Sequence, residues 1–155
     1  MSQESQASAS PRKELLSFRL GEQEFCVDIM AVREIRGWTE ATPLPRAPDY
    51  IRGMINLRGT VFPIVDMSAR LGLPLNDLAS RRVIIVVWIG TKLVGLLVDA
   101  VCDIIAVTDA ELQPTPELAG ETIRSFVSAV LTVENRMLCL IALNYLIPEL
   151  DEAAA

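Results

Sequence analysis

The chain has 155 residues, 51% of them hydrophobic and 22% charged, which favours one globular unit or two very small ones that share a core. The net charge of −6 disfavours nucleic acid and anionic membranes as partners, because both are bound through clustered Lys and Arg, so protein partners are expected. The chain has no histidine and no CxxC pair, which excludes the common zinc sites, histidine-based triads and a phosphohistidine relay on this chain.

Both ends of the chain are expected to lie outside the folded part. Residues 1–13 are polar and lack the apolar segment of a signal peptide, and residues 151–155 form an unanchored tail. Residues 14–150 are predicted to form a single domain of two subdomains, with a boundary near 75–82 and with exchange of strands between the subdomains left open. The protein is predicted to be cytoplasmic.

Between these ends, short β-branched segments alternate at close spacing with Gly, Pro, Asn and Asp, a pattern typical of small all-β barrels or sandwiches. Helices are expected only at about 66–71, at a turn opened by the Thr108/Glu111 capping pattern, and at about 144–150. Two packed five-stranded β-barrels would accommodate all the predicted strands. These strands cover residues 15–20, 24–30, 33–37, 52–57, 60–66, 83–89, 93–99, 101–106, 127–133 and 137–143.

A break in the apolar alternation occurs twice and indicates a duplicated unit. Phe25, Val27 and Ile29 keep a period of two, but the next apolar residues are Val32 and Ile35, which predicts a bulge or bend after Ile29. Two unrelated β-meanders that share these features are the alternative to a repeat. A shift of 69 positions aligns the two copies, and it places Gly21 on Gly90, Phe25 on Val94, Val27 on Leu96, Ile29 on Val98, Val32 on Val101, Glu34 on Asp103 and Ile35 on Ile104.

The segment "GMINLRGTVFPIVDM" (53–67) holds one cation between two apolar runs. Asn-Leu-Arg-Gly predicts a turn that presents Arg58, which is either a solvated turn arginine or part of a binding surface. Glu34 lies beside Arg33 and Arg36, so a solvent-facing ion pair is the alternative to a binding role for it. Pro63 cannot donate a ladder hydrogen bond, so its strand is expected at an edge or a bulge.

The most apolar segment, "VIIVVWIGTKLVGLLV" (83–98), is predicted to be a β-hairpin. It has about 16 residues against the ~20 that a spanning helix needs, and Gly90-Thr91-Lys92 falls in its middle, so insertion into a membrane is not expected. Few polar residues alternate with the apolar ones, which predicts that both faces are covered. The cover is either the junction of the two halves or, in part, another protein.

No residues form a recognisable catalytic centre, so an enzyme and a cofactor are not expected. Asp28, Asp66 and Asp99 end or interrupt apolar strands, where a carboxylate most often caps a turn or helix. The glycines form neither GxGxxG nor a phosphate-binding loop. Cys26 lies in an apolar strand, and apolar residues flank Cys102 and Cys139. All three are expected to be small buried side chains in a reducing compartment, with a nucleophilic or redox cysteine as the alternative.

Four segments in order carry a resemblance to a known family. They are "FRLGEQEFCVDIMAVREIRG" (18–37), "PLPRAPDYIRGMINLRGTVFPIVDM" (43–67), "GLLVDAVCDII" (95–105) and "PTPEL" (114–118). With these segments the chain resembles the CheW family, the chemotaxis coupling proteins, from about Leu15 to Leu150. The first half is the more specific, through Leu-Gly, Glu-Ile, Gly-x-x-Asn-Leu-Arg-Gly and Pro-Ile-Val-Asp, whereas the second half depends mainly on "VGLLVDAV".

The resemblance implies a fold of two five-stranded SH3-like barrels and a non-enzymatic adaptor. Such an adaptor joins the histidine kinase CheA, through its CheW-like domain, to the cytoplasmic tips of methyl-accepting chemoreceptors in membrane-associated arrays. The family often has a cation at position 113 and an aromatic residue at position 118, so Gln113 and Leu118 imply a weakened or rewired contact with the kinase. The implied receptor-binding groove between the barrels consists of Val32, Glu34, Gly53, Arg58, Val61, Gly95 and Val101, and the implied kinase contact of Gln113, Glu117 and Leu118.

Three other functions compete with this one. A CheW-like adaptor of a pathway for surface motility, second-messenger or biofilm control would have the same residue pattern. A small hydrolase would require Asp99 and Asp103 to converge in a pocket. An OB-like nucleic-acid binder would require surface aromatic residues and basic clusters, whereas only 5% of the residues are aromatic.

Overall fold

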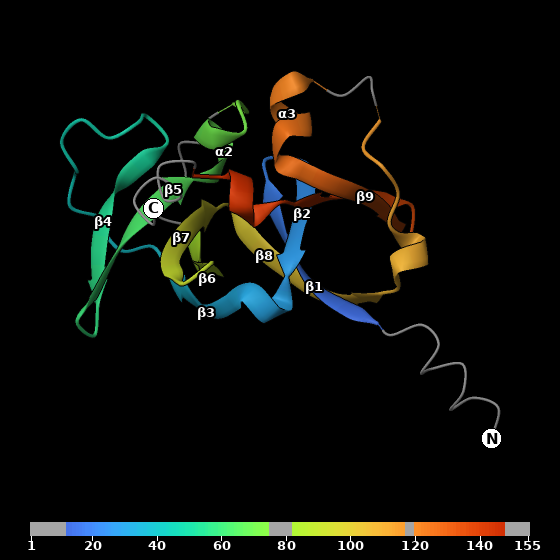
Figure 1. The fold of residues 1–155 in the computed structure, drawn as a ribbon, viewed down its shortest axis with the longest axis horizontal. Helices are drawn as coiled ribbons and strands as arrows, with labels where there is room; N and C mark the ends of the chain where they lie inside the picture. Colours follow the sequence, from blue (N-terminus) through green and yellow to red (C-terminus); the bar gives the residue numbers. More distant parts are fainter. Residues whose placement is uncertain (1–11, 75–81, 117–119, 148–155) are drawn as a thin grey trace.

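Two five-stranded sheets make up the fold. The computed structural model describes residues 12–74, 82–116 and 120–147. Sheet A has the strand order β8-β1-β2-β10-β9 and sheet B the order β3-β6-β7-β5-β4, and the two lie side by side along the long axis of the molecule (Figure 1). The predicted all-β fold class is confirmed. Among the described strands, the two edge strands of each sheet are not paired with each other, so each barrel is open.

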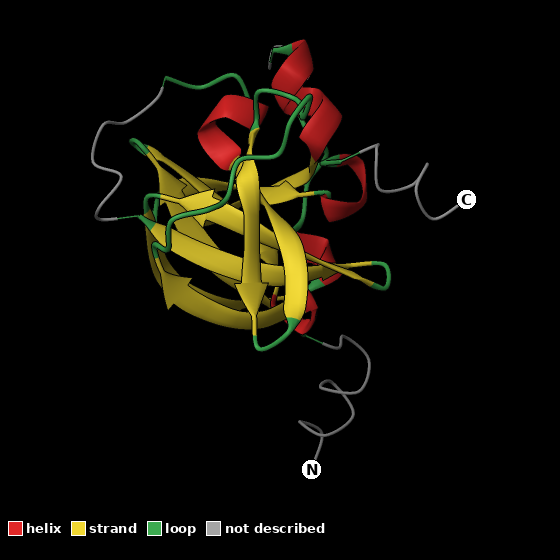
Figure 2. Cartoon of the chain, turned by 90° about the vertical axis from the view of Figure 1, so that its left-hand side faces the viewer, coloured by secondary structure: helices red, strands yellow, loops and turns green. Residues whose placement is uncertain are grey.

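The secondary structure agrees closely with the predicted strands. Short helices sit at the ends of the strands rather than forming a layer of their own (Figure 2). The helices are η1 (Ile29–Ala31), α2 (Met67–Arg70), η3 (Asp109–Glu111), α3 (Glu121–Phe126) and η4 (Leu143–Tyr145). The strands are β1 (Lys13–Leu20), β2 (Gln23–Asp28), β3 (Val32–Gly37), β4 (Ile51–Leu57), β5 (Thr60–Asp66), β6 (Val83–Ile89), β7 (Lys92–Val98), β8 (Ala100–Val107), β9 (Val127–Val133) and β10 (Arg136–Ile141).

The predicted break after Ile29 is confirmed, and Asp28 explains it. The Asp28 carboxylate accepts a hydrogen bond from the Met30 amide at 2.9 Å, which ends β2 at residue 28 and opens the single turn η1. The strand predicted to reach residue 30 is therefore shorter. The register of β3 against β6 then shifts between Val32 and Glu34, which is the bulge that the sequence pattern indicates.

Each sheet contains strands from both halves of the sequence. β3 pairs antiparallel with β6 in sheet B, and β8 pairs antiparallel with β1 in sheet A. In equivalent positions, β10 lies parallel to β2, and β5 lies parallel to β7. In chain order, sheet B is built from the continuous run β3–β7, whereas sheet A combines β1 and β2 with β8–β10. Most of the predicted boundary near 75–82, and most of both predicted tails, lie outside the described residues, although Lys13 already belongs to β1.

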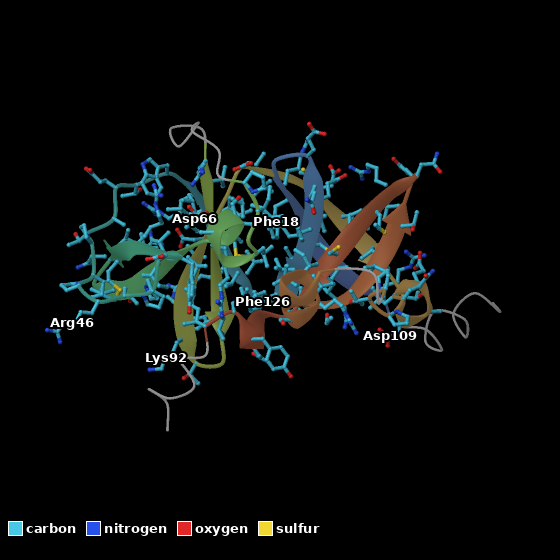
Figure 3. The ribbon with its side chains drawn as sticks, turned by 90° about the horizontal axis from the view of Figure 1, so that it is seen from above. Phe18, Arg46, Asp66, Lys92, Asp109 and Phe126 are labelled. Atoms are coloured by element: carbon cyan, nitrogen blue, oxygen red, sulfur yellow. The ribbon has the colours of Figure 1, made fainter. Side chains whose placement is uncertain are left out.

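Alternate residues of the interior strands β6 and β7 face two different hydrophobic cores. In β6, Ile84 and Val86 point into the concave side of sheet B, whereas Ile85 and Val87 belong to the central core between the sheets. Phe18 of β1 lies in that central core, between the two halves (Figure 3). Both faces of the β6–β7 hairpin are thus largely covered within the chain, as predicted, except at Trp88, which is 40% exposed. Full burial of one such side chain contributes about 1.5–3 kcal/mol.

The β6–β7 pair is the predicted hairpin, with an antiparallel register from Val83↔Val98 to Ile89↔Lys92. None of the helices in the described part of the chain is long and apolar enough to cross a membrane.

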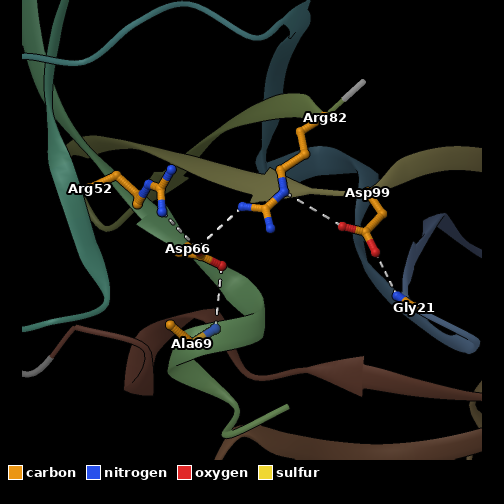
Figure 4. A network of polar contacts seen from close by, with 6 residues as sticks. All are labelled: Gly21, Arg52, Asp66, Ala69, Arg82 and Asp99. Carbon is orange, nitrogen blue, oxygen red and sulfur yellow. Dashed lines mark hydrogen bonds and ion pairs between the residues drawn. The ribbon is translucent and has the colours of Figure 1, made fainter. Parts of the chain in front are cut away.

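A buried polar network joins the two sheets at one end of the junction (Figure 4). Asp66, at the end of β5, lies 3.3 Å from the Arg82 guanidinium and 3.6 Å from that of Arg52, and it also accepts the Ala69 amide of α2 at 3.3 Å. Arg82 lies 3.8 Å from Asp99, whose other oxygen accepts the Gly21 amide at 2.6 Å in the β1–β2 turn of sheet A. Asp66 and Asp99 therefore have the capping roles predicted for them.

Arg70 of α2 forms a second connection between the sheets. Its guanidinium carbon lies 4.0 Å from the ring centre of Tyr50, which precedes β4, and 4.4 Å from that of Phe126, which ends α3. Its Nε donates to the carbonyl of Leu146 at 2.6 Å. One cation therefore contacts segments from both halves of the molecule and from the C-terminal region.

Candidate functional site

Arg58 occupies the tip of the β4–β5 hairpin in a left-handed conformation. Leu57 and Thr60 are the last paired residues, and Arg58 and Gly59 have φ angles of 51° and 90°, as a two-residue type I′ turn requires. The Asn56 side chain accepts the Gly59 amide at 2.9 Å and closes the predicted Asn-Leu-Arg-Gly turn. The β9–β10 turn repeats positive φ angles at Glu134 and Asn135, so this conformation belongs to the duplicated hairpin.

Glu34 holds the Arg58 side chain. Arg58 Nη2 donates to Glu34 Oε1 at 2.9 Å, and Arg36 Nη1 donates to Glu34 Oε2 at 3.3 Å. The Arg58 side chain is nevertheless 68% exposed, against 23% for Glu34. A guanidinium has five N–H donors, so Arg58 retains donors for a partner while one edge is fixed by Glu34.

Val32 is the first residue of the edge strand β3, Val101 is the second residue of the edge strand β8, and the two occupy equivalent positions in the repeat. Both are half-buried and pack against the central core. Val32 pairs with Val87, and Val101 with Phe18. The main role of both side chains is therefore to pack at the junction of the two sheets.

The two glycines of the predicted groove are packed inside the chain. Gly53 has a φ of +145°, and a Cβ there would collide with the Thr42 carbonyl, whose segment bridges to Met54. A Cβ on Gly95 would lie 2.5 Å from Ile64 Cδ1 and 2.9 Å from Ile84 Cγ2, inside sheet B. Both positions require glycine for the internal packing of sheet B.

Pro63 does not lie on an edge strand, because β5 pairs with both β4 and β7. Hydrogen-bonded pairs alternate along an antiparallel ladder, and Leu57–Thr60 closes the turn, so Met54–Pro63 is a pair without hydrogen bonds. The nitrogen of Pro63 therefore faces away from β4, toward β7. The ladder to β7 covers only Ile64–Asp66, so no hydrogen bond is lost at Pro63.

Val61 lines a hollow that opens where β5 separates from β7. The hollow has a volume of about 390 Å³, and Val61 is 56% exposed. Its other principal lining residues are Arg33, Pro63, Trp88, Lys92 and Leu93. The predicted site residues did not include Trp88, Arg33 or Lys92. Trp88 was missed because a tryptophan within an apolar strand is expected to be buried.

A second hollow, of about 350 Å³, lies under the proline-rich loop that precedes β4. Its lining is largely apolar and includes Leu44, Pro45, Pro48, Met54 and Ile147. Leu44 is 47% exposed. Sheet B therefore carries two separate concavities, one of mixed polarity and one largely apolar, and Pro63 lines both.

The predicted kinase contact is described only in part. Gln113 is exposed, and its backbone pairs with Val130 of β9 through two hydrogen bonds of 2.8 Å. Glu117 and Leu118 lie outside the described residues. Of the predicted groove residues, Glu34 and Arg58 contact each other through their side chains. Gly53 and Gly95 lie inside sheet B.

The geometry required for a hydrolase does not occur. Asp99 is engaged with Gly21 and Arg82, whereas Asp103 lies 3.9 Å from Arg136, and its backbone exchanges hydrogen bonds with the Ser17 hydroxyl. The two carboxylates therefore serve different partners. Within residues 12–74, 82–116 and 120–147, no three Cys, Asp or Glu side chains are grouped so that they could hold a metal ion.

The three cysteines carry free thiols, and the predicted burial is confirmed for Cys26 but is wrong for Cys102 and Cys139, which are half-buried. Burial, reinforced by the nearby Cys139 and Glu24, raises the pKa of Cys26 to about 12. Burial also raises the pKa of the Cys102 and Cys139 thiols. Since the thiolate is the nucleophile, these shifts oppose the alternative of a nucleophilic cysteine.

Comparisons with known proteins agree with this architecture. The family model of the CheW-like domain matches residues 14–151. The chain is 56% identical over 143 residues to the chemotaxis protein CheW of Rhizobium meliloti (strain 1021), covering 92% of each protein. It is 33% identical over 135 residues to the chemotaxis protein CheW of Klebsiella aerogenes, covering 87% of this chain and 81% of the relative. The crystal structure of the scaffolding protein TtCheW from Thermoanaerobacter tengcongensis superposes with a TM-score of 0.81 at 30% identity, covering 88% of this chain and 92% of that one.

Proposed function

The chain belongs to the family of CheW-like domain proteins, and from this membership we propose that it couples methyl-accepting chemoreceptors to the histidine kinase CheA. The family consists of non-enzymatic chemotaxis scaffold proteins. In the proposed role the chain is cytoplasmic and is recruited to receptor arrays at the membrane. It contacts the receptor tip and the kinase through separate surfaces.

The exposed Arg58, fixed along one edge by Glu34, is the observation that carries the receptor side of the proposal. A receptor carboxylate or carbonyl accepts from the free donors of the guanidinium, and Val61 on the same hairpin supplies apolar contact. Because Glu34 restrains the side chain before binding, less conformational entropy is lost when the receptor docks. The proposed groove extends from this hairpin past Val32 and Val101 at the junction of the sheets.

The kinase side of the proposal is assigned to sheet A. Gln113 is exposed beside β9, and the family resemblance adds Glu117 and Leu118. Arg58 lies on sheet B, so one molecule can hold a receptor and a kinase at the same time. Simultaneous binding is the property that an adaptor needs.

Capture of partners from a lysate of the source cell, with identification by mass spectrometry, tests the proposal. We expect the wild type to retain a CheA-type kinase and receptors, and Arg58→Glu to retain the kinase while receptor binding weakens by about 1–3 kcal/mol. Arg19→Glu, which alters an exposed arginine on β1, is the matched control and should bind both. Capture of neither partner by the folded wild type would refute the proposal.

A charge swap separates the internal ion pair from receptor binding. Glu34→Arg combined with Arg58→Glu restores opposite charges at the two positions but presents a carboxylate at the hairpin tip. We expect receptor binding to stay weak in the swapped protein, and recovery to the wild-type level would remove Arg58 from the contact. The identity of the captured receptors also decides between swimming chemotaxis and a pathway of surface motility, second-messenger or biofilm control.

A further inference from the structure

The hollow beside Val61, called the Trp88 hollow from here on, exposes the apolar side chains of Val61 and Trp88. Trp88 is 40% exposed, although its neighbours in β6, Val87 and Ile89, are only 0% and 7% exposed. Val61 faces the same hollow with 56% of its surface exposed. A half-exposed tryptophan in a concave site is the residue type most often found at the energetic centre of a protein interface.

The rim of the Trp88 hollow is positively charged. The Arg33 guanidinium lies 5.7 Å from the centre of the Trp88 ring, and Lys92 lies on β7, the strand paired with β6, from which it projects at the edge of the molecule (Figure 3). None of the described residues that line the hollow carries a carboxylate, whereas the whole chain has a net charge of −6. Charge complementarity therefore favours an acidic partner at this position.

The backbone around the hollow restricts the form of that partner. β5 has separated from β7 here, and the nitrogen of Pro63 faces the opening without a hydrogen to donate. An added β-strand would lack a ladder hydrogen bond at that residue, so strand addition is disfavoured. A helix, which satisfies its own backbone and inserts only side chains, is the better match. A volume of about 390 Å³ accommodates one large apolar side chain of such a helix.

We propose that the Trp88 hollow receives an apolar side chain from an acidic helical segment of the receptor tip, with carboxylates on that helix paired to Lys92 and Arg33. This inference rests on the proposed receptor-binding function and extends the groove beyond Arg58 and Val61. The hollow supplies the apolar anchor of the contact, and Arg58 supplies a charged contact that fixes its register.

The test uses the full chain and, as the probe, the soluble cytoplasmic fragment of a receptor captured by the wild type. In a Trp38→Phe background Trp88 is the only tryptophan, and its emission should move to shorter wavelength when the fragment binds. Trp88→Ala and Lys92→Glu should each weaken fragment binding by about fivefold or more, the effect expected of an interface hot spot. Trp88→Phe and Lys92→Arg should bind nearly as well as the wild type.

Met137→Ala is the matched control, because Met137 is 62% exposed but lies on β10 of sheet A. It should leave binding unchanged, and all variants should keep the wild-type unfolding midpoint and kinase binding. The inference is overturned if Arg58→Glu weakens fragment binding while Trp88→Ala and Lys92→Glu do not, a result that leaves the proposed function intact. It is also overturned if the Trp88 variants lose the kinase, or a second copy of the chain, instead of the receptor fragment. Failure of the wild type to bind any receptor fragment would refute both proposals.

Discussion

Gly95 shows how one residue can affect binding through the fold alone. A methyl group at this position would press on Ile64 and Ile84 in the interior of sheet B. We predict that Gly95→Ala lowers the free energy of unfolding by about 1–3 kcal/mol, because added atoms force a packed core to shift. Urea unfolding measures this difference. Gly37→Ala, where the new Cβ meets open space, is the matched control and should change stability little; equal effects of the two substitutions would contradict the packing argument.

Cys26 should make stability depend on pH in the alkaline range. Burial raises the pKa of its thiol from 9.0 to about 12, so the folded chain holds the proton while the unfolded chain releases it above about pH 9. The contribution of the neutral thiol is complete below pH 9 and is lost as the pH rises toward 12. The wild type should therefore lose more stability between pH 8 and pH 11 than Cys26→Ala does, as measured by urea unfolding at both pH values. An equal loss in the two proteins would show that Cys26 ionises as easily in the folded state.

Residue roles were predictable where they depend on local chemistry. Asp28 and Asp66 cap the turns that follow them, and Glu111 accepts the Thr108 amide at 2.8 Å, as the sequence pattern indicates. The packing of Gly53 and Gly95 depends on residues distant in the sequence, so their internal role was not predictable. The sequence resemblance assigned both glycines to the groove. The structure shows that internal packing alone requires glycine at both positions, whether or not a partner binds there.

At the scale of elements, the strands were predictable and the helices less so. Period-two alternation with Gly and Asn turns defined ten strands, because successive residues of a strand point to opposite faces of its sheet. Helix α3 was missed, since its six residues are too few for a helical period and its formation depends on tertiary contacts. The prediction that Pro63 lies at an edge or a bulge was wrong, because β5 is an interior strand, the register shift lies at Ile51/Gly53 of β4, and the pairing of β5 with β7 begins only at Ile64.

Arg70 shows how short elements hold the two sheets together. We predict that Arg70→Ala lowers the free energy of unfolding by about 2 kcal/mol or more, since it removes two cation–π contacts and a charged hydrogen bond at once. Arg70→Lys should have an intermediate effect, because an ammonium cannot stack on both rings. Thermal or urea unfolding measures both variants, and a loss below about 0.5 kcal/mol for Arg70→Ala would show that this connection is not important.

For the whole molecule, the hydrophobic core that the two sheets share predicts that they unfold together. Side chains from β1 and β2 of sheet A and from β5, β6 and β7 of sheet B belong to this one core, so neither sheet can unfold without exposing apolar side chains of the other. Urea unfolding should show one transition, with tryptophan emission from Trp38 and Trp88 and far-ultraviolet circular dichroism changing at the same concentration. Two separate transitions would mean that the sheets are independent units despite the shared core.

The central claim, that this chain couples receptors to a kinase, is tested most directly by sedimentation of receptor-containing membranes with a CheA-type kinase. We predict that the wild-type chain increases the kinase recovered with the membranes severalfold, and that Arg58→Glu, which still binds the kinase, does not. A recovery of kinase that is the same with the wild type, with Arg58→Glu and without the chain would contradict the account.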